Sequence, residues 1–254
     1  MKLDRRNFIR MCGVGILGLG ATQADKIFAV GSGKYQSTVS TKGKRWAMVI
    51  DTKKCADCDD CIVACHKGHN VPEISDKKEE IKWIWKEDFE HSFPGLGHEH
   101  VNAELKKRPF LLLCNHCENP ACVRVCPTKA TFKREDGVVM MDYHRCIGCR
   151  FCMAGCPYGA RSFNFQDPRL SMRNEDTNML YPTRTKGVVE KCNFCAERLV
   201  KGEMPLCVEA CRNGAIHFGD LNDPNSEVRK LMESQPTIQR SASLGTFPNV
   251  YYII

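Results

Sequence analysis

Short apolar runs, most of them four to seven residues long, dominate the hydrophobic pattern of this 254-residue chain. None of them continues as the three-four spacing of a long amphipathic helix. Continuous or alternating apolar residues at these lengths predict β-strands. We therefore expect strands at 46–50, 80–86 and 215–218.

A tight hairpin is predicted over 130–141, where two alternating runs flank Asp136-Gly137. This dipeptide between alternating runs is the strongest short-range hairpin pattern. A short helix is expected over 226–233, with Ser226 as its N-cap. The segment after it is extended and ends in apolar and aromatic residues. Such an end is expected to dock on this protein or on a partner.

Cysteine changes this picture most, because 16 of the 17 cysteines fall into four quartets that each close with C-x3-C. The third quartet reads C-x2-C-x2-C-x3-C-P, and the first repeats its spacing. The second has spacings of 2, 4 and 3, and the fourth of 2, 11 and 3. In chain order the quartets are Cys55, Cys58, Cys61 and Cys65; Cys114, Cys117, Cys122 and Cys126; Cys146, Cys149, Cys152 and Cys156; Cys192, Cys195, Cys207 and Cys211.

The spacing of the third quartet is the bacterial ferredoxin pattern for a [4Fe-4S] cluster. Four such clusters need sixteen soft thiolate ligands, and the quartets supply that number. A disulfide framework and zinc knuckles are the alternatives, but the 2-2-3 spacing that closes in Cys-Pro is not a zinc pattern. We predict four [4Fe-4S] clusters and little stable structure without them.

The closing cysteine of a ferredoxin quartet ligates the neighbouring cluster, so the quartets must work in pairs. The hairpin joins quartets two and three, and the strands at 46–50 and 215–218 adjoin quartets one and four. This nested pairing predicts four ligand sets. They are Cys55, Cys58, Cys61 and Cys211; Cys192, Cys195, Cys207 and Cys65; Cys114, Cys117, Cys122 and Cys156; Cys146, Cys149, Cys152 and Cys126. The alternative is a tandem pairing of one with two and three with four.

The predicted fold class is α+β, with tandem bacterial-ferredoxin-like units as two pseudo-symmetric two-cluster modules, small sheets and many loops. The expected parts are a signal segment (1–31), a flexible leader (32–45), an outer unit (46–70 and 187–233), an insertion (71–113), an inner unit (114–162), a linker (163–186) and a docking tail (234–254).

The first residues predict export in the folded state. Asp4-Arg5-Arg6-Asn7-Phe8 matches the twin-arginine consensus, and a weak apolar run over 11–21 follows it. This run is too short to span a bilayer, which takes about 20 residues. We expect the twin-arginine export machinery as a partner and a place on the periplasmic or extracytoplasmic face of the membrane. Cys12, outside the quartets, is predicted to be incidental.

The formal charge of +7 does not predict a nucleic-acid partner. Each [4Fe-4S] cluster with four thiolates carries about −2, so four clusters would offset the excess of basic residues. Clusters with four cysteine ligands have no open iron for substrate, so a non-catalytic electron-transfer role is predicted. Arg212, directly after Cys211, is expected to raise the potential of a nearby cluster.

Several stretches around the quartets resemble the four-cluster iron–sulfur subunits of membrane-bound oxidoreductases, such as polysulfide, dimethyl sulfoxide and formate-linked complexes. They are 113–122, 156–160 and 218–224. Further stretches at 140–146, 161–169 and 181–192 resemble the periplasmic iron–sulfur O subunit of the Dsr transmembrane complex, which is associated with dissimilatory sulfite reduction.

This resemblance implies a relay of electrons through the four clusters. The implied partners are an NrfD-like integral membrane subunit that binds menaquinone, a multihaem cytochrome c and further subunits of a transmembrane redox complex. The family also implies the nested pairing. Two alternatives remain: the electron-transfer subunit of a molybdopterin polysulfide or sulfoxide reductase, and a structural or adaptor subunit stabilised by its metal.

Overall fold

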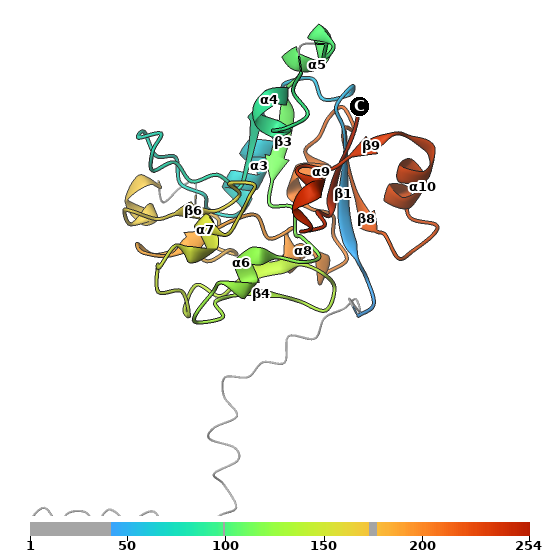
Figure 1. Cartoon of the computed structure of the whole chain (residues 1–254). Coiled ribbons are helices and arrows are strands. Elements are labelled where there is room, and N and C mark those ends of the chain that lie inside the picture. The colour runs from blue at the N-terminus through green and yellow to red at the C-terminus, as the bar shows by residue number, and fades with distance from the viewer. Residues whose placement is uncertain (1–41, 99, 173–176) are drawn as a thin grey trace, which may run out of the picture. The chain divides into compact units, whose positions relative to one another are not determined.

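Four strands far apart in the sequence form the largest sheet. The computed structural model describes residues 42–98, 100–172 and 177–254, and there the sheet has the order β8-β1-β10-β9 (Figure 1). β1 is antiparallel to β8 and parallel to β10, and β9 is antiparallel to β10. The bounds are Trp46–Asp51 for β1, Ile216–Asp220 for β8, Thr237–Ile238 for β9 and Val250–Ile253 for β10.

The two faces of β1 pack into different apolar clusters because successive side chains of a strand point to opposite faces. Met48 and Ile50 belong to the large core that contains many of the cysteines. Ala47 and Val49 lie in a smaller core together with Val228 of helix α10 (Glu227–Ser234). A strand that is buried on both faces has to be apolar throughout, which explains its continuous hydrophobic run.

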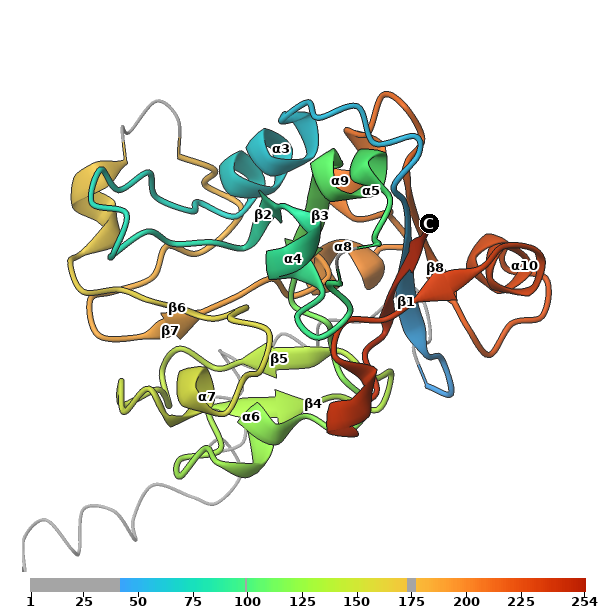
Figure 2. The ribbon, with the colours of Figure 1, turned by 45° about the horizontal axis from the view of Figure 1, so that its top comes forward.

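Three two-stranded sheets make up the rest of the β-structure in the described residues. They pair β2 (Ile84–Glu87) with β3 (Phe110–Leu113), β4 (Thr131–Lys133) with β5 (Val139–Met141), and β6 (Ser162–Phe163) with β7 (Val189–Glu190) (Figure 2). All three are antiparallel.

The helices are short, and several of them carry cysteines. The longest are α3 (Asp60–Gly68) and α10, and the 3₁₀ turns are η1 (Pro168–Ser171) and η3 (Ala242–Leu244). The remaining helices are α4 (Phe89–Ser92), α5 (Ala103–Lys107), α6 (Ala121–Arg124), α7 (Phe151–Ala154), α8 (Ala196–Leu199) and α9 (Leu206–Glu209). No helix in the described part of the chain is long and apolar enough to cross a membrane.

Most of the predicted elements are confirmed. The strands at 46–50 and 215–218 are β1 and β8, and the hairpin is β4–β5 with Gly137 at a φ of 83°. Helix α10 begins as expected, because the Ser226 side chain accepts a hydrogen bond from the Arg229 N–H. The tail docks on this protein: β10 pairs with β1, and the Tyr252 hydroxyl donates to the Leu111 carbonyl at 2.9 Å.

The strand predicted at 80–86 is wrong at its start. β2 begins only at Ile84, because its partner β3 ends at Leu113, directly opposite. Ile81 and Trp83 are buried, so their alternation reflects burial without strand pairing. β3 itself was not predicted.

The signal segment and residues 32–41 of the leader lie outside the described residues. The backbone of Arg45 is hydrogen-bonded to the Asp220 side chain, so the sheet region begins there. The described residues form one compact unit. The other predicted boundaries and the two pseudo-symmetric modules remain predictions.

Candidate iron–sulfur sites

All four C-x2-C turns share one backbone feature. The residue before the second cysteine has positive φ in each: Asp57 (51°), His116 (41°), Gly148 (70°) and Phe194 (56°). Such a left-handed residue makes a concave turn whose backbone N–H groups can face a bound anion. At Gly148 a side chain is excluded as well, because a Cβ would overlap the backbone carbonyl of Gly187. The turns are therefore shaped alike despite their different sequences.

Three of the four closing cysteines share a second feature. Lys129, Gly159 and Gly214, each three residues after a closing cysteine, have φ values of 55°, 63° and 58°. This conformation turns the next backbone N–H toward sulfur. The Ala215 N–H donates to Cys211 Sγ at 3.2 Å, and the N–H groups of Ala130 and Ala160 donate to Cys126 and Cys156. Hydrogen bonds to sulfur adjust cluster potentials.

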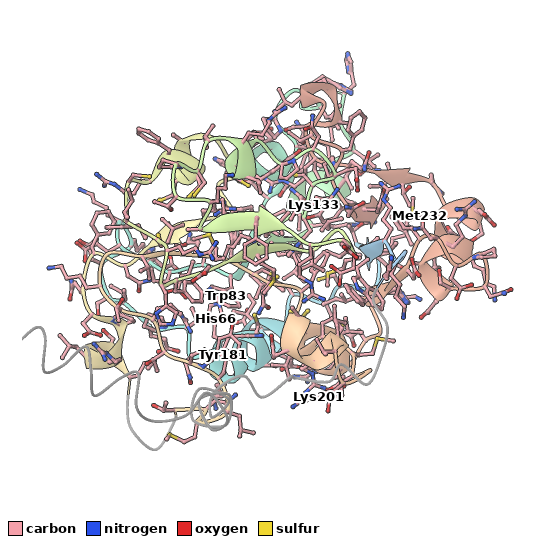
Figure 3. The ribbon with its side chains drawn as sticks, turned by 90° about the horizontal axis from the view of Figure 1, so that it is seen from below. His66, Trp83, Lys133, Tyr181, Lys201 and Met232 are labelled. Carbon is pink, nitrogen blue, oxygen red and sulfur yellow. The ribbon has the colours of Figure 1, made fainter. Side chains whose placement is uncertain are left out.

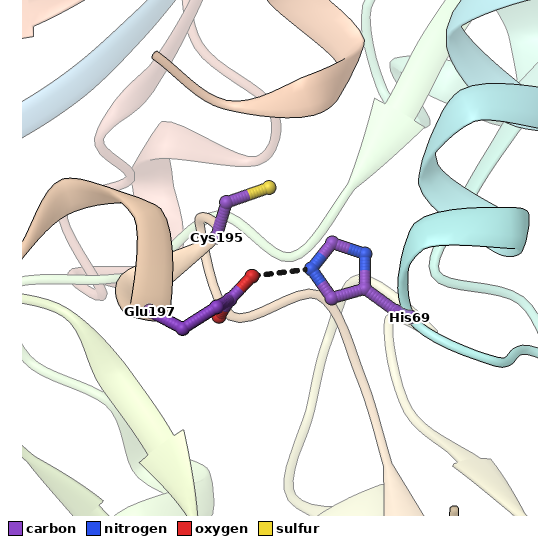
Figure 4. A group of neighbouring side chains, drawn as sticks. All are labelled: His69, Cys195 and Glu197. Carbon is purple, nitrogen blue, oxygen red and sulfur yellow. Dashed lines mark hydrogen bonds and ion pairs between the residues drawn. The ribbon is translucent and has the colours of Figure 1, made fainter. Parts of the chain in front are cut away.

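The first quartet departs from this pattern because α3 continues through Cys65 to Gly68. A histidine lies where the other quartets have a backbone donor: His69 Nδ1 is 2.9 Å from the Cys65 backbone carbonyl oxygen and 3.7 Å from Cys65 Sγ. Its Nε2 is 2.9 Å from Glu197 Oε1, and His69, Cys195 and Glu197 form one close group (Figure 4). Burial alone would raise the pKa of Glu197, but the His69 hydrogen bond and charge hold it below its ordinary value. The group ties α3 to the fourth quartet.

The structure brings together thiols from different quartets. Burial raises the pKa values of several of them, and repulsion from neighbouring thiolates raises these pKa values further. Cys211 acts in this way on Cys55 and Cys61, and the thiols of the fourth quartet act on Cys65. The groups seen in this way are Cys55, Cys58, Cys61 and Cys211; Cys65, Cys192, Cys195 and Cys207; Cys114, Cys117, Cys122 and Cys156; Cys146 and Cys152. Cys126 and Cys149 enter none of these thiol groups.

Electrostatic interactions between thiols of different groups arrange the groups in a series. Burial is the main cause of the raised pKa of Cys65. The thiol of Cys61, in the first group, raises this pKa further. Burial and the Cys114 thiol together raise the pKa of Cys192 to about 12. Cys122 adds to the effect of burial on Cys152. The groups of quartets one and four therefore continue into those of quartets two and three.

The donor set fits iron–sulfur clusters. Burial raises the pKa of Cys207 well above its ordinary value and that of Cys117 to about 12, so these thiols stay protonated unless a soft cation replaces the protons. One cavity is lined by Cys114, Cys117, Cys122 and Cys156. Asn115 has a buried amide that lacks a partner within the described residues, which leaves a donor for a bound group. The sixteen described cysteines are all free, and this argues against a disulfide framework.

Arg161 is a buried cation that contacts this cavity. Its guanidinium donates to Cys122 Sγ at 3.0 Å and to Thr131 Oγ1 at 2.7 Å, and only 5% of the residue is exposed. Its charge also acts on Cys152 of the neighbouring group. Arg161 is not among the predicted site residues, because nothing in its local spacing indicates that its side chain points at sulfur.

Arg212, in contrast, is largely exposed, and its guanidinium is hydrogen-bonded through two nitrogens to the Asp60 carboxylate. Its charge is balanced by this partner. We therefore expect Arg161 to influence the clusters more than Arg212 does.

A buried ion pair holds the segments of quartets one and four together. Arg184 and Glu190 both have fully buried side chains, with Arg184 Nη2 at 2.6 Å from Glu190 Oε2. Arg184 also donates to the backbone carbonyls of His69 and Asn70, just after α3. The Trp83 indole donates to Glu190 at 2.8 Å and packs edge-on against Tyr181. Figure 3 labels Trp83 and Tyr181, which lie near each other. Part of the predicted linker is thus an internal brace.

Glu190→Gln is expected to lower the free energy of unfolding by about 3–5 kcal/mol, because it leaves the buried Arg184 charge unpaired. Denaturant unfolding followed by circular dichroism measures this. The matched control is Glu233→Gln, which removes an exposed i,i+4 partner of Arg229 and should cost less than about 0.5 kcal/mol. Equal losses in the two variants would contradict the role assigned to the buried pair.

Comparison with known proteins agrees with the thiol geometry. A family model for a 4Fe-4S dicluster domain matches residues 109–171 and again 177–221. An iron–sulfur subunit of an Hdr-like menaquinol oxidoreductase from Archaeoglobus fulgidus is 41% identical over 98% of this chain and 97% of its own length. The chain belongs to the ferredoxin-type 4Fe-4S subunits of oxidoreductase complexes. This iron–sulfur subunit therefore contains [4Fe-4S] clusters, about four in number, as its sixteen quartet cysteines require.

Two further relatives extend the comparison. The iron–sulfur cluster-binding subunit of a menaquinone reductase from Nitratidesulfovibrio vulgaris is 40% identical over 82% of this iron–sulfur subunit and 88% of the relative. Protein NrfC of Escherichia coli is 33% identical over 100% of this chain and 96% of its own length. The family membership makes this chain an electron-transfer component of a membrane oxidoreductase complex, and it is consistent with the absence of catalysis by the chain itself.

Proposed function

We propose that this subunit relays electrons through four [4Fe-4S] clusters between a menaquinone-binding, NrfD-like membrane subunit and a periplasmic multihaem cytochrome c, in a Dsr-type complex of sulfur metabolism. The single observation that carries the relay is the continuous series of thiol groups. Each cluster, when bound, accepts or gives one electron at a time. The fold keeps the four thiol groups in sequence and buries the group of Cys65, Cys192, Cys195 and Cys207.

The proposed ligand sets are the nested ones: Cys55, Cys58, Cys61 and Cys211; Cys65, Cys192, Cys195 and Cys207; Cys114, Cys117, Cys122 and Cys156; Cys126, Cys146, Cys149 and Cys152. Twelve of these cysteines lie in three thiol groups that mix two quartets and follow the nested sets, and Cys146 and Cys152 of the third quartet lie together. The packing of α3 on α9 supports the set that joins Cys65 to the fourth quartet. Gly68 of α3 leaves room for the Leu206 side chain of α9, so the two helices lie close together. The β4–β5 hairpin, which joins quartets two and three, supports the pairing of these two quartets.

The proposed partners and location rest on the relatives and on the first residues of the chain. Two of the relatives are named for menaquinol or menaquinone chemistry, which supports a quinone-binding membrane partner. Arg5 and Arg6 support export by the twin-arginine machinery and a place on the periplasmic face.

A reductive titration of the purified, cluster-loaded protein followed by electron paramagnetic resonance tests the relay. Four [4Fe-4S] signals that are reduced within the physiological range are expected. If no cluster is reduced there, the clusters only hold the fold together, and the chain is the metal-stabilised structural or adaptor subunit of the alternative.

A second candidate is the electron-transfer subunit of a molybdopterin reductase. Relatives named as subunits of selenate, dimethyl sulfoxide and tetrathionate reductases, 32–39% identical, favour it. Purification of the native complex decides between the two, because a pterin-binding large subunit indicates the reductase and a haem c subunit indicates the Dsr-type complex.

A further inference from the structure

Lys191, directly before the fourth quartet, is a cation buried without a counter-ion. Only 1% of the residue is exposed, and its Nζ donates to the backbone carbonyls of Val139 and Cys192, to the latter at 2.6 Å. Both acceptors are neutral, and no carboxylate among the described residues forms an ion pair with this side chain. A buried ammonium that lacks a counter-ion costs several kcal/mol. A negative group that compensates the charge is therefore expected close by.

The carboxylate next to it in the sequence, Glu190, is already paired. Its Oε2 accepts from Arg184 and from the Trp83 indole, and its Oε1 accepts from the Asn164 amide. Arg184 and Glu190 balance each other's charge. The segment that leads into the fourth quartet thus keeps one buried positive charge, that of Lys191.

Lys191 lies at the junction between two thiol groups. We call the proposed clusters there the Cys114 cluster (Cys114, Cys117, Cys122 and Cys156) and the Cys192 cluster (Cys65, Cys192, Cys195 and Cys207). Val139 of β5 connects the two sides, because its N–H donates to His116 Nδ1 at 3.0 Å while its carbonyl accepts from Lys191. The rings of His116 and Phe194, one from each C-x2-C turn, stack with their centroids 3.7 Å apart. The two turns therefore meet where the ammonium is buried.

The charge of Lys191 acts on both sides of this junction. Burial and the Cys114 thiol raise the pKa of Cys192, and the Lys191 charge opposes them. Burial lowers the pKa of His116 in the second quartet, and the Lys191 charge lowers it further. The ammonium is thus close enough to influence a bound group in either quartet.

The first quartet has no comparable charge. Asp57 and Asp59 both pair with Lys86, at 2.7 and 2.9 Å, and Asp60 pairs with Arg212. Charges there are balanced at the surface of the chain. The buried, unbalanced charge belongs to the middle of the thiol series.

We propose that the Lys191 ammonium is the counter-ion shared by the Cys114 and Cys192 clusters, and that it stabilises the electron in transit at the middle of the relay. The proposal rests on the relay proposed above. A reduced cluster carries one negative charge more than an oxidised one, so a fixed positive charge nearby raises its potential. In the step itself one electron passes between neighbouring clusters, one of which is oxidised while the other is reduced, and no bond is made or broken. Because Arg161 acts on the Cys114 cluster as well, the electron is most stable there.

A charge-removing variant at Lys191 tests this proposal. Lys191→Gln keeps a hydrogen-bond donor for the two carbonyls but removes the charge. The matched control is Lys201→Gln, which removes the same charge at an exposed position within the fourth quartet. Both are compared with the parent as cluster-loaded, full-length proteins, in a potentiometric titration followed by electron paramagnetic resonance.

Lys191→Gln should lower the potentials of two clusters by at least tenfold in the reduction equilibrium, which is about 59 mV for one electron. One of these two clusters, and only one, should also respond to Arg161→Gln, because only the Cys114 cluster adjoins both cations. Lys191→Arg keeps the charge and should recover most of the shift. Lys201→Gln should leave all four potentials unchanged.

The other outcomes separate the counter-ion from the relay. No shift with Lys191→Gln, or an equal shift with Lys201→Gln, overturns the counter-ion alone, because the clusters remain reducible. An equal shift with Lys191→Arg overturns it too, since packing would then be the cause. Loss of iron from Lys191→Gln but not from Lys191→Arg supports the proposal, whereas loss from both overturns it. Parent clusters that cannot be reduced at all overturn the relay and the counter-ion together.

Discussion

The double variant Cys65→Ala/Cys207→Ala is expected to lose roughly a quarter of its iron, the content of one cluster of four. In the nested arrangement both cysteines serve the same cluster, so the second substitution costs nothing beyond the first. The proximity of Cys65 to the thiols of the fourth quartet is the physical reason. Iron analysis and the count of resonance signals measure the outcome.

The crossed variant Cys65→Ala/Cys122→Ala is the matched comparison. It removes ligands of two clusters in the nested arrangement and should lose roughly half of the iron. The tandem pairing reverses the two results, since Cys65 would then share a cluster with Cys122. Cys12→Ala, at the cysteine outside the quartets, should keep the full iron content.

Arg161→Gln should lower the potentials of two clusters, those proposed on either side of the guanidinium. The buried charge donates to Cys122 Sγ and acts on Cys152, and it favours the more negative, reduced form of a nearby cluster. We expect a change of at least tenfold in the reduction equilibrium, which is about 59 mV for one electron. A potentiometric titration resolves the shifted pair from the two unshifted clusters.

Arg161→Lys keeps the charge and should recover part of the shift. Arg212→Gln is the exposed counterpart and should leave all four potentials nearly unchanged, because Asp60 already balances its charge. A uniform shift of every cluster by Arg161→Gln would indicate a general loosening of the fold and would contradict a local electrostatic effect.

Local patterns explain why much of this protein was predictable from its sequence. A quartet, a hairpin turn at Gly137 and a cap at Ser226 are each fixed by a few neighbouring residues. The brace of Arg184 and Glu190 and the contact from Arg161 to Cys122 depend on segments up to 115 positions apart. Such contacts follow from tertiary packing, which composition and spacing do not encode, and the start of β2 was mispredicted for the same reason.

The position of β1 between β8 and β10 bears on how the chain is made. β1 ends at residue 51, and its first partner begins 165 residues later, at Ile216. At a synthesis rate of about 5–20 residues per second, β1 waits roughly 8–33 s for that partner. During this interval an apolar strand and the four thiols that follow it are unprotected from aggregation and oxidation. A nascent chain of this design therefore needs a chaperone, or early delivery of iron and sulfide, before its sheet can close.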